Sequence, residues 1–162
     1  ELKALSPDCA IETDFSIVIP DAYVTNITER LSLYSTIDNL KSQEELEMFQ
    51  ISLIDRFGPL PKEVEALANT VLMRWKAEKI GFEKLVLKNG IMKGYFVPSE
   101  NESYYKSEVF GTILSYVQQH SKSCRLKEQS KKLILFVDNI NSIEKATQLL
   151  EDILLKVALP HE

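Results

Sequence analysis

The sequence predicts an α+β domain in which an N-terminal strand and a three-helix segment precede a β-β-α-β-β-α order with a mostly antiparallel sheet. Three observations support this fold. Apolar residues recur at helical spacing through residues 25–80. Asn89-Gly90 separates two strand-like segments, and both positions of such a two-residue turn need positive φ. A second strand pair and a capped helix follow between residues 123 and 156.

The first part of the chain is expected to hold one short strand, over residues 15–19, and three helices at about residues 25–40, 43–57 and 61–80. Each helix has an apolar stripe at a spacing of three or four residues, which predicts the face that turns inward. The stripes are Ile27, Leu31, Tyr34 and Ile37 in the first helix; Leu46, Phe49, Leu53 and Phe57 in the second; and Val64, Leu67, Val71, Leu72 and Trp75 in the third.

The ends of the second helix are well specified. Ser42 with Glu45 three residues later is typical of a capping box, in which the two side chains bond to each other's backbone N–H groups. Gly58 suits a left-handed residue after the last turn, and Pro59 cannot continue a helix. Pro61 suits the first turn of the next helix. The sequence therefore predicts a helix, a short connection and a second helix.

The second part of the chain begins with strands over residues 82–88 and 91–97 around Asn89-Gly90. After a polar loop at 98–102, Ser107 is expected to cap a helix. Strands over 123–127 and 132–138 follow, and Asn141 with Glu144 predicts another capped helix that reaches about residue 156. We assign residues 1–13 to a linker or N-terminal extension, 14–157 to a single domain and 158–162 to a tail.

Composition predicts a piece of a larger intracellular protein. A chain of 162 residues with 44% hydrophobic residues is long enough for one domain with a real core. It begins at Glu1 without a signal peptide, and no run reaches the length of a membrane span. Cys9 and Cys124 lie far apart, so we expect reduced thiols, no disulfide or zinc site, and a cytoplasmic location.

The sequence shows no pattern typical of catalysis. None of the five glycines lies in a G-x-x-x-x-G-K-[ST] loop, so no ATP site is expected here. His120 and His161 have no neighbours at metal-ligand spacing, and no G-x-S-x-G motif occurs. Glu44, Glu45 and Glu47 cluster in the first turns of a helix, where acids favour the helix dipole. We therefore expect no enzyme activity, cofactor or metal in this chain.

The net charge of −5 disfavours binding of DNA by this domain alone, because proteins that hold nucleic acid by its phosphates collect Lys and Arg on one face. One basic cluster brackets the turn of the second predicted hairpin. It permits two interpretations: a solvated sheet edge that discourages aggregation, or a contact for nucleic acid. The cluster comprises Lys122, Arg125, Lys127, Lys131 and Lys132.

Asp55 requires an explanation that core packing does not supply. It lies in the last turn of its helix, where a negative charge opposes the dipole and costs a few tenths of a kcal/mol, whereas neighbouring Arg56 is favourable there. One interpretation is a salt bridge within the domain, to Arg30 or to Arg56. The other is that Asp55 belongs to a face that docks on a partner.

Two motifs resemble the C-terminal domain of bacterial transcription-repair coupling factors, the Mfd family. The first is Ile19-Pro20-Asp21-Ala22-Tyr23-Val24 followed by Asn26, Arg30, Leu31 and Tyr34, and the second is Leu53-Ile54-Asp55-Arg56-Phe57-Gly58-Pro59-Leu60-Pro61. The resemblance extends from about residue 14 to about residue 155 and is strongest between 19 and 67. The combination of the two motifs is specific, whereas either alone is weak.

The resemblance implies a regulatory function. Proteins of this family are ATP-driven DNA translocases, with ATP and Mg in their motor domains, that displace stalled RNA polymerase and recruit UvrA through an N-terminal module resembling part of UvrB. Their C-terminal domain packs against that module and covers the UvrA-binding surface. We therefore expect a non-catalytic, autoinhibitory domain whose direct partner is the UvrB-like module and whose indirect partners are UvrA and RNA polymerase. No membrane contact and little or no DNA binding are expected.

The expected docking face is the outer side of the second helix. Met48, Ser52 and Asp55 are spaced i, i+4 and i+7 and so project together, and Asp55 would accept an Arg or Lys of the module. Ser52 stands where an acidic residue is expected in many relatives, which leaves one fewer charge here. Arg56, Glu45 and Glu44 are secondary candidates.

Two alternatives remain open from the sequence. The domain could be a nucleic-acid accessory module that uses the basic region from Lys122 to Lys132, or an interaction domain that contacts RNA polymerase or the translocase motor. Arg30, Tyr34, Phe57 and Gly58 also match the family motifs, but helix pairing, core packing and capping suffice to explain them.

Overall fold

The computed structural model describes residues 4–6 and 8–159. These residues divide into two compact units: a helical unit, Ser16–Leu72, and a sheet unit, Glu1–Phe15 with Met73–Glu162. The chain passes from the first to the second within helix α3 (Lys62–Ile80), which contributes residues to both.

The helical unit contains α1 (Ile27–Asp38), α2 (Gln43–Phe57) and the first turns of α3. All three helices form close to their predicted positions. The strand predicted over residues 15–19 is wrong: this segment forms no strand, and the N–H of Ile19 instead donates a hydrogen bond to the Tyr34 hydroxyl at 2.7 Å. The core of the unit is built from two or three buried apolar residues per helix and from the segment before α1: Ile19, Val24, Leu33, Ile37, Leu46, Leu53, Val64, Ala68 and Val71.

The inward face of α1 differs from the prediction. Leu33 and Ile37 are buried, whereas Ile27 and Leu31 are 64% and 63% exposed. Ile37 belongs to both the predicted and the observed stripe, and the helix packs along the neighbouring row that contains Leu33. Periodicity alone could not decide between these two rows, because both are apolar.

The ends of α2 are mostly as predicted. Ser42 Oγ accepts the N–H of Glu45 at 3.2 Å, and Glu45 Oε2 accepts the N–H of Lys41 at 3.0 Å, one residue earlier than in a standard capping box. At the other end, Gly58 has φ +93° and ψ −169°, and its N–H donates to Ile54 O at 2.9 Å. The positive φ that glycine was expected to supply is therefore present.

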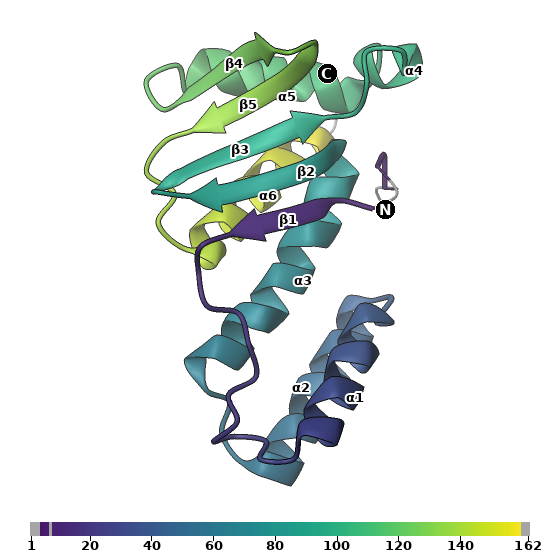
Figure 1. Ribbon diagram of the computed structural model, residues 1–162. Coiled ribbons are helices and arrows are strands. Elements are labelled where there is room, and N and C mark those ends of the chain that lie inside the picture. Colours follow the sequence, from purple (N-terminus) through teal and green to yellow (C-terminus); the bar gives the residue numbers. More distant parts are fainter. Residues whose placement is uncertain (1–3, 7, 160–162) are drawn as a thin grey trace. The chain divides into compact units, whose positions relative to one another are not determined.

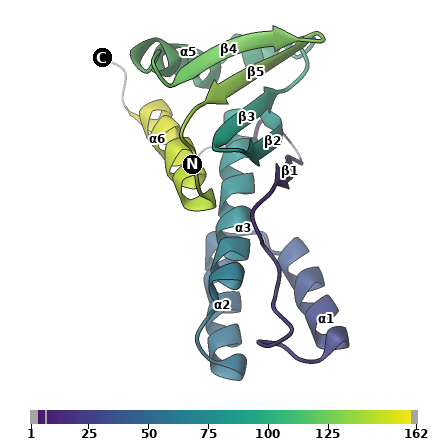
Figure 2. The ribbon, with the colours of Figure 1, turned by 60° about the vertical axis from the view of Figure 1, so that its left-hand side comes forward.

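The sheet unit has five strands in the order β1-β2-β3-β5-β4. They are β1 (Ala10–Thr13), β2 (Phe82–Lys88), β3 (Ile91–Phe96), β4 (Cys124–Gln129) and β5 (Lys132–Val137). The pairing of β1 with β2 is parallel and the other three are antiparallel, which confirms the mostly antiparallel sheet. Figure 1 shows α5 (Glu108–Gln119) and α6 (Ile143–Ala158) behind the strands, and Figure 2 shows the same arrangement from the side.

The N-terminal strand lies earlier than predicted. It occupies Ala10–Thr13, within the segment that we assigned to a linker or N-terminal extension, and pairs with β2 so that Ala10 lies opposite Lys84. Cys9, just before the strand, is buried, and its N–H donates to Glu78 Oε2 at 3.0 Å. A strand of four residues is too short to show a clear alternation of apolar and polar side chains. Its position is set instead by pairing with β2, which is distant in the sequence.

The turns and helix caps define where the strands and helices of the second half of the chain begin and end. Asn89 and Gly90 have φ of +55° and +73°, which confirms the predicted turn, and Ser130 and Lys131 provide the same positive φ between β4 and β5. Ser107 caps α5 as predicted. A short helix, α4 (Glu102–Tyr105), forms where the predicted loop ends.

The cap of α6 corrects another prediction. The N-cap is Ser142, whose Oγ accepts the N–H of Lys145 at 3.0 Å, and not Asn141. Both residue types are good caps, so the start of the helix could be read one residue early. Among the described residues, no helix is long and apolar enough to cross a membrane.

Candidate functional site

The outward side of α2 presents a mixed apolar and acidic surface. Leu46 and Leu53, seven residues apart, are 2% and 1% exposed and define the inward side. The opposite side, at 3.6 residues per turn, carries a row spaced i, i+4, i+7 and i+11. We call this row the α2 outer face; it consists of Glu44, Met48, Ile51 and Asp55, all exposed.

The structure places the predicted site residues in two groups. Glu44, Met48 and Asp55 lie on the α2 outer face, and Ser52 is exposed beside it. Glu45 and Arg56 are engaged locally: Glu45 bonds to the backbone at the start of the helix, and Arg56 forms an ion pair with Glu29 of α1.

Sequence reasoning missed Ile51, which is 59% exposed. Helical spacing could have found it, because Ile51 lies three residues after Met48 and four before Asp55, opposite the inward leucines. Met48 itself is 66% exposed and Ile54, at the edge of the face, is 47% exposed. Three exposed large apolar side chains therefore flank Asp55 on one helix.

Asp55 has no charged partner in the part of the chain that the structure describes, and the proposed salt bridge within the domain is not formed. Arg56 pairs with Glu29. The guanidinium of Arg30 donates to the carbonyl oxygens of Val24 and Thr25, at 2.6 and 3.3 Å. Both arginines that could neutralise Asp55 are thus committed elsewhere, so its carboxylate remains available.

The two family-like motifs meet at the end of α2. The Tyr23 hydroxyl lies 2.7 Å from Gly58 O and 3.1 Å from Leu53 O, and its ring packs on Phe57 with centroids 5.6 Å apart. Burial raises the pKa of the Tyr23 hydroxyl, which keeps it a donor. The Arg56 guanidinium lies over the Phe57 ring, with Cζ 4.7 Å from the ring centroid. These contacts fix the last turn, and therefore the position of Asp55.

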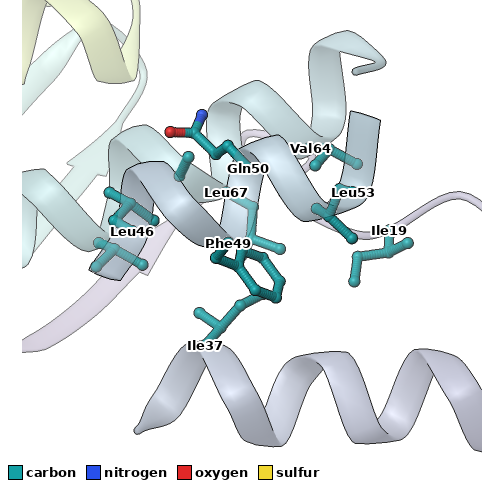
Figure 3. A pocket seen from close by; sticks show the side chains of 10 residues that line it. Ile19, Ile37, Leu46, Phe49, Gln50, Leu53, Val64 and Leu67 are labelled. Atoms are coloured by element: carbon teal, nitrogen blue, oxygen red, sulfur yellow. The ribbon is translucent and has the colours of Figure 1, made fainter. Parts of the chain in front are cut away.

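The interior between the helices offers no ligand site. The cavity there has a volume of about 10 Å³, and Gln50 is the one polar residue of its lining. Figure 3 shows Phe49 pointing toward Ile37. Such a space holds at most one water, and its apolar walls favour leaving it empty. A partner or ligand of this unit would therefore have to bind on its outside.

Charge is distributed unequally between the two units. Residues 16–72 contain nine Asp or Glu and four Lys or Arg, so they carry the whole net charge of −5. The remaining residues contain fifteen of each sign. The α2 outer face therefore lies on the strongly acidic unit.

The His and Cys side chains of the described residues have surroundings typical of structural residues. No group of three His, Cys, Asp or Glu side chains could hold a metal ion there. His120 stacks on Tyr116 with ring centroids 4.0 Å apart, and His161 lies outside the described residues. Burial, with a smaller contribution from Glu78, raises the pKa of the Cys9 thiol to about 12, and burial also raises the pKa of Cys124. Neither thiol is suited to act as a nucleophile near neutral pH.

Comparison with known proteins defines the class of this chain. The fold matches the crystal structure of a C-terminal domain of transcription-repair coupling factor with a TM-score of 0.73 and 18% identity, over 94% of this chain and 95% of that one. The model of the TRCF domain matches residues 13–107. The chain therefore belongs to the TRCF domain family.

Relatives extend this assignment. The chain is 31% identical over 142 residues to the transcription-repair-coupling factor of Rickettsia typhi, covering 86% of this chain and 12% of the relative. It is 35% identical over 80 residues to that of Escherichia coli K12, covering 49% of this chain and 7% of the relative. The chain corresponds to the C-terminal TRCF domain of a transcription-repair coupling factor and spans about one eighth of the length of the Rickettsia relative.

Proposed function

We propose that this domain is a non-catalytic, autoinhibitory domain that docks through the α2 outer face on the UvrB-like N-terminal module of the same coupling factor and masks the surface that binds UvrA. The observation that supports this most is the exposed Asp55 carboxylate, which has no charged partner among the described residues although Arg56 is its neighbour in sequence. A charge that costs helix stability and gains nothing within its own unit is expected to act on a partner.

The apolar part of the face supports the same proposal. Met48 and Ile51 are 66% and 59% exposed, and they lie side by side between Glu44 and Asp55 along the row. Interfaces that form and release typically combine a small apolar centre with a polar rim. Here Met48 and Ile51 would form the centre, and Glu44 and Asp55 the charged ends.

Electrostatics favour a basic surface as the partner. The helical unit carries the whole net charge of −5, so it attracts a surface rich in Lys and Arg over roughly one Debye length, about 8 Å at physiological salt. Asp55 then forms a direct pair with one Arg or Lys of the module. Because that pair lies at an exposed helix end, its strength falls as salt rises.

Docking of this kind regulates UvrA binding, because the docked domain covers the surface that binds UvrA. If the domain leaves the UvrA surface free for only about one hundredth of the time, the apparent affinity for UvrA falls about a hundredfold. Both partners belong to one polypeptide in this proposal, so the effective concentration is high and the individual contacts can be weak. Weak contacts allow release when the rest of the protein changes conformation.

The test is a competition experiment with the purified domain, the UvrB-like module of the same organism and UvrA. We expect the domain to bind the module, more weakly at moderate than at low salt, and to be displaced by UvrA in proportion to its concentration. A ternary complex of all three proteins would contradict masking. Absence of binding at high micromolar concentrations would contradict docking on this module.

A further inference from the structure

One face of the sheet carries a concentration of positive charge that the docking proposal does not use. Figures 1 and 2 show α5 and α6 on the same side of the strands, leaving the other side without a helix of the sheet unit. We call the side without helices the open face. Strand register and alternation place six Lys or Arg side chains there, together with Glu12 of β1 and several apolar and aromatic side chains. The cations are Lys84, Lys88, Lys93, Arg125, Lys127 and Lys132, and the other residues that the argument uses are Tyr95, Ile134 and Phe136.

Three cations of the open face converge on one aromatic ring. Lys93 of β3 and Arg125 of β4 lie directly opposite Phe136 in the register of the sheet, on either side of it. Lys93 Nζ, Arg125 Cζ and Lys127 Nζ lie 5.5, 5.2 and 5.4 Å from the centroid of the ring. Phe136 is 7% exposed, as expected where long cationic side chains lie over a ring. Phe136 therefore holds three positive charges near one another.

Acidic residues do not balance this cluster. Arg125 pairs with Asp138 at 3.0 Å, whereas Lys93 and Lys127 have no carboxylate partner among the described residues. The other cations of the open face have acidic neighbours: Glu12 lies 3.2 Å from Lys84 and 3.8 Å from Lys88, and Glu83 pairs with Lys132. The open-face cations without a carboxylate in the described part of the chain are therefore the two lysines beside Phe136. Like charges held together repel one another, and an anion placed above Phe136 would relieve that repulsion.

A second ring adjoins the cluster. Tyr95 of β3 lies between Lys84 and Ile134 in register, and Lys127 lies beyond Ile134 on β4. The Tyr95 side chain is half-buried, with Lys84 Nζ 5.2 Å from its centroid. Proteins hold single-stranded nucleic acids with cations that follow the phosphate chain and with aromatic rings on which the bases stack.

We propose that the open face binds single-stranded RNA, with Lys93, Arg125 and Lys127 on its phosphates and Tyr95 against a base. β3 and β5, which carry Tyr95 and Phe136, are inner strands of the five-stranded sheet, where sheet platforms present rings to RNA. Unpaired RNA offers its bases without the cost of opening a duplex. The open face includes Arg125, Lys127 and Lys132 of the basic cluster predicted from the sequence, and it adds Lys93 of β3. Lys122 precedes β4 and Lys131 lies in the β4–β5 turn, so neither occupies a strand position of this face.

The test measures binding of a fluorescein-labelled polyuridine strand of 15 nucleotides by the 162-residue chain, by anisotropy at several salt concentrations. Contacts to three phosphates predict a slope of log affinity against log salt of about −2. The variant Lys93→Gln/Arg125→Gln/Lys127→Gln should lose most of that slope and bind about tenfold or more weakly. Tyr95→Leu should weaken binding about fivefold or more without changing the slope.

A matched variant, Lys122→Gln/Lys131→Gln/Lys145→Gln, removes the same charge away from the open face and should bind like the unchanged chain. Thermal melting of each variant establishes that it is folded. Equal weakening by the two triple variants would overturn the site, because only overall charge would then matter. Undetectable RNA binding, or binding of duplex or single-stranded DNA as tight as that of RNA, would overturn the proposal as well. The open face and the α2 outer face lie on different units, so this result is independent of docking on the UvrB-like module.

Discussion

The guanidinium of Arg56 pairs with the carboxylate of Glu29 on α1 and leaves Asp55, its neighbour on α2, without a charged partner among the described residues. The pair joins residues 27 positions apart and lies beside the contact of Arg56 with the Phe57 ring. The last turn of α2 therefore uses its positive charge for its own fold and presents its negative charge to the outside.

Asp55→Asn should leave the helical unit folded and slightly more stable, by a few tenths of a kcal/mol, because it removes a negative charge from the C-terminal turn. Glu29→Gln should instead destabilise it by up to about 1 kcal/mol, as is usual for an exposed pair. Urea unfolding followed by circular dichroism measures both. A loss of stability in Asp55→Asn larger than in Glu29→Gln would mean that Asp55 has a stabilising partner in its own unit.

Tyr23→Phe should destabilise the chain by about 1 kcal/mol, because it removes the hydroxyl that hydrogen-bonds to the backbone at the end of α2. The hydroxyl lies 2.7 Å from Gly58 O. Tyr95→Phe is the matched control, because no hydrogen bond of the Tyr95 hydroxyl occurs in the described part of the chain. Equal urea midpoints for the two variants would contradict this role for Tyr23.

Gly58→Ala and Gly111→Ala should have opposite effects. A Cβ at either position meets no atom within 4 Å, so space does not distinguish them. Gly58 has φ +93° and ψ −169°, a region almost exclusive to glycine, and alanine there should cost about 1 to 3 kcal/mol. Gly111 lies inside α5, where alanine should gain about 0.5 to 1 kcal/mol. Thermal midpoints that shift in the same direction would refute this reading of the backbone.

The Cys9 thiol should make stability fall at alkaline pH. Its pKa is raised to about 12 in the fold, mainly by burial, from an ordinary value of 9.0. The protonated thiol is therefore favoured by the fold, and its contribution is complete below pH 9 and is lost as the pH rises from 9 toward 12. Cys9→Ala should lessen this alkaline loss relative to the unchanged chain in urea titrations between pH 8 and 10.5. An identical pH dependence for both would contradict the assignment.

Features that depend on neighbours in sequence could be predicted, and features that depend on distant partners could not. The ends of α2 and the Asn89-Gly90 turn follow from local chemistry, and the structure has both. The position of β1 depends on pairing with β2, more than 60 residues later, so the strand was predicted at the wrong place. The choice of Leu33 over Leu31 for the core likewise depends on how α1 packs on the other helices.

The candidate site shows the same division. Helical spacing was enough to group Met48 with Asp55, but Ile51 was missed because an apolar residue on a helix is usually assigned to the core. The pairing of Arg56 with Glu29 joins two helices, so the sequence could not exclude a salt bridge from Arg56 to Asp55. The open face is still harder to predict, because the cations around Phe136 come from β3 and β4 and the ring from β5, and these strands meet only in the folded sheet.

The most direct test of the account is the affinity of the UvrB-like module for the unchanged domain, for Asp55→Lys and for Asp38→Lys. Asp38 ends α1 as an exposed acid of the same unit, so Asp38→Lys makes the same change of charge away from the α2 outer face. We predict that Asp55→Lys weakens binding about tenfold, roughly 1.4 kcal/mol, while Asp38→Lys changes it little and both variants melt as the unchanged domain does. Equal affinities of Asp55→Lys and the unchanged domain would contradict docking through Asp55.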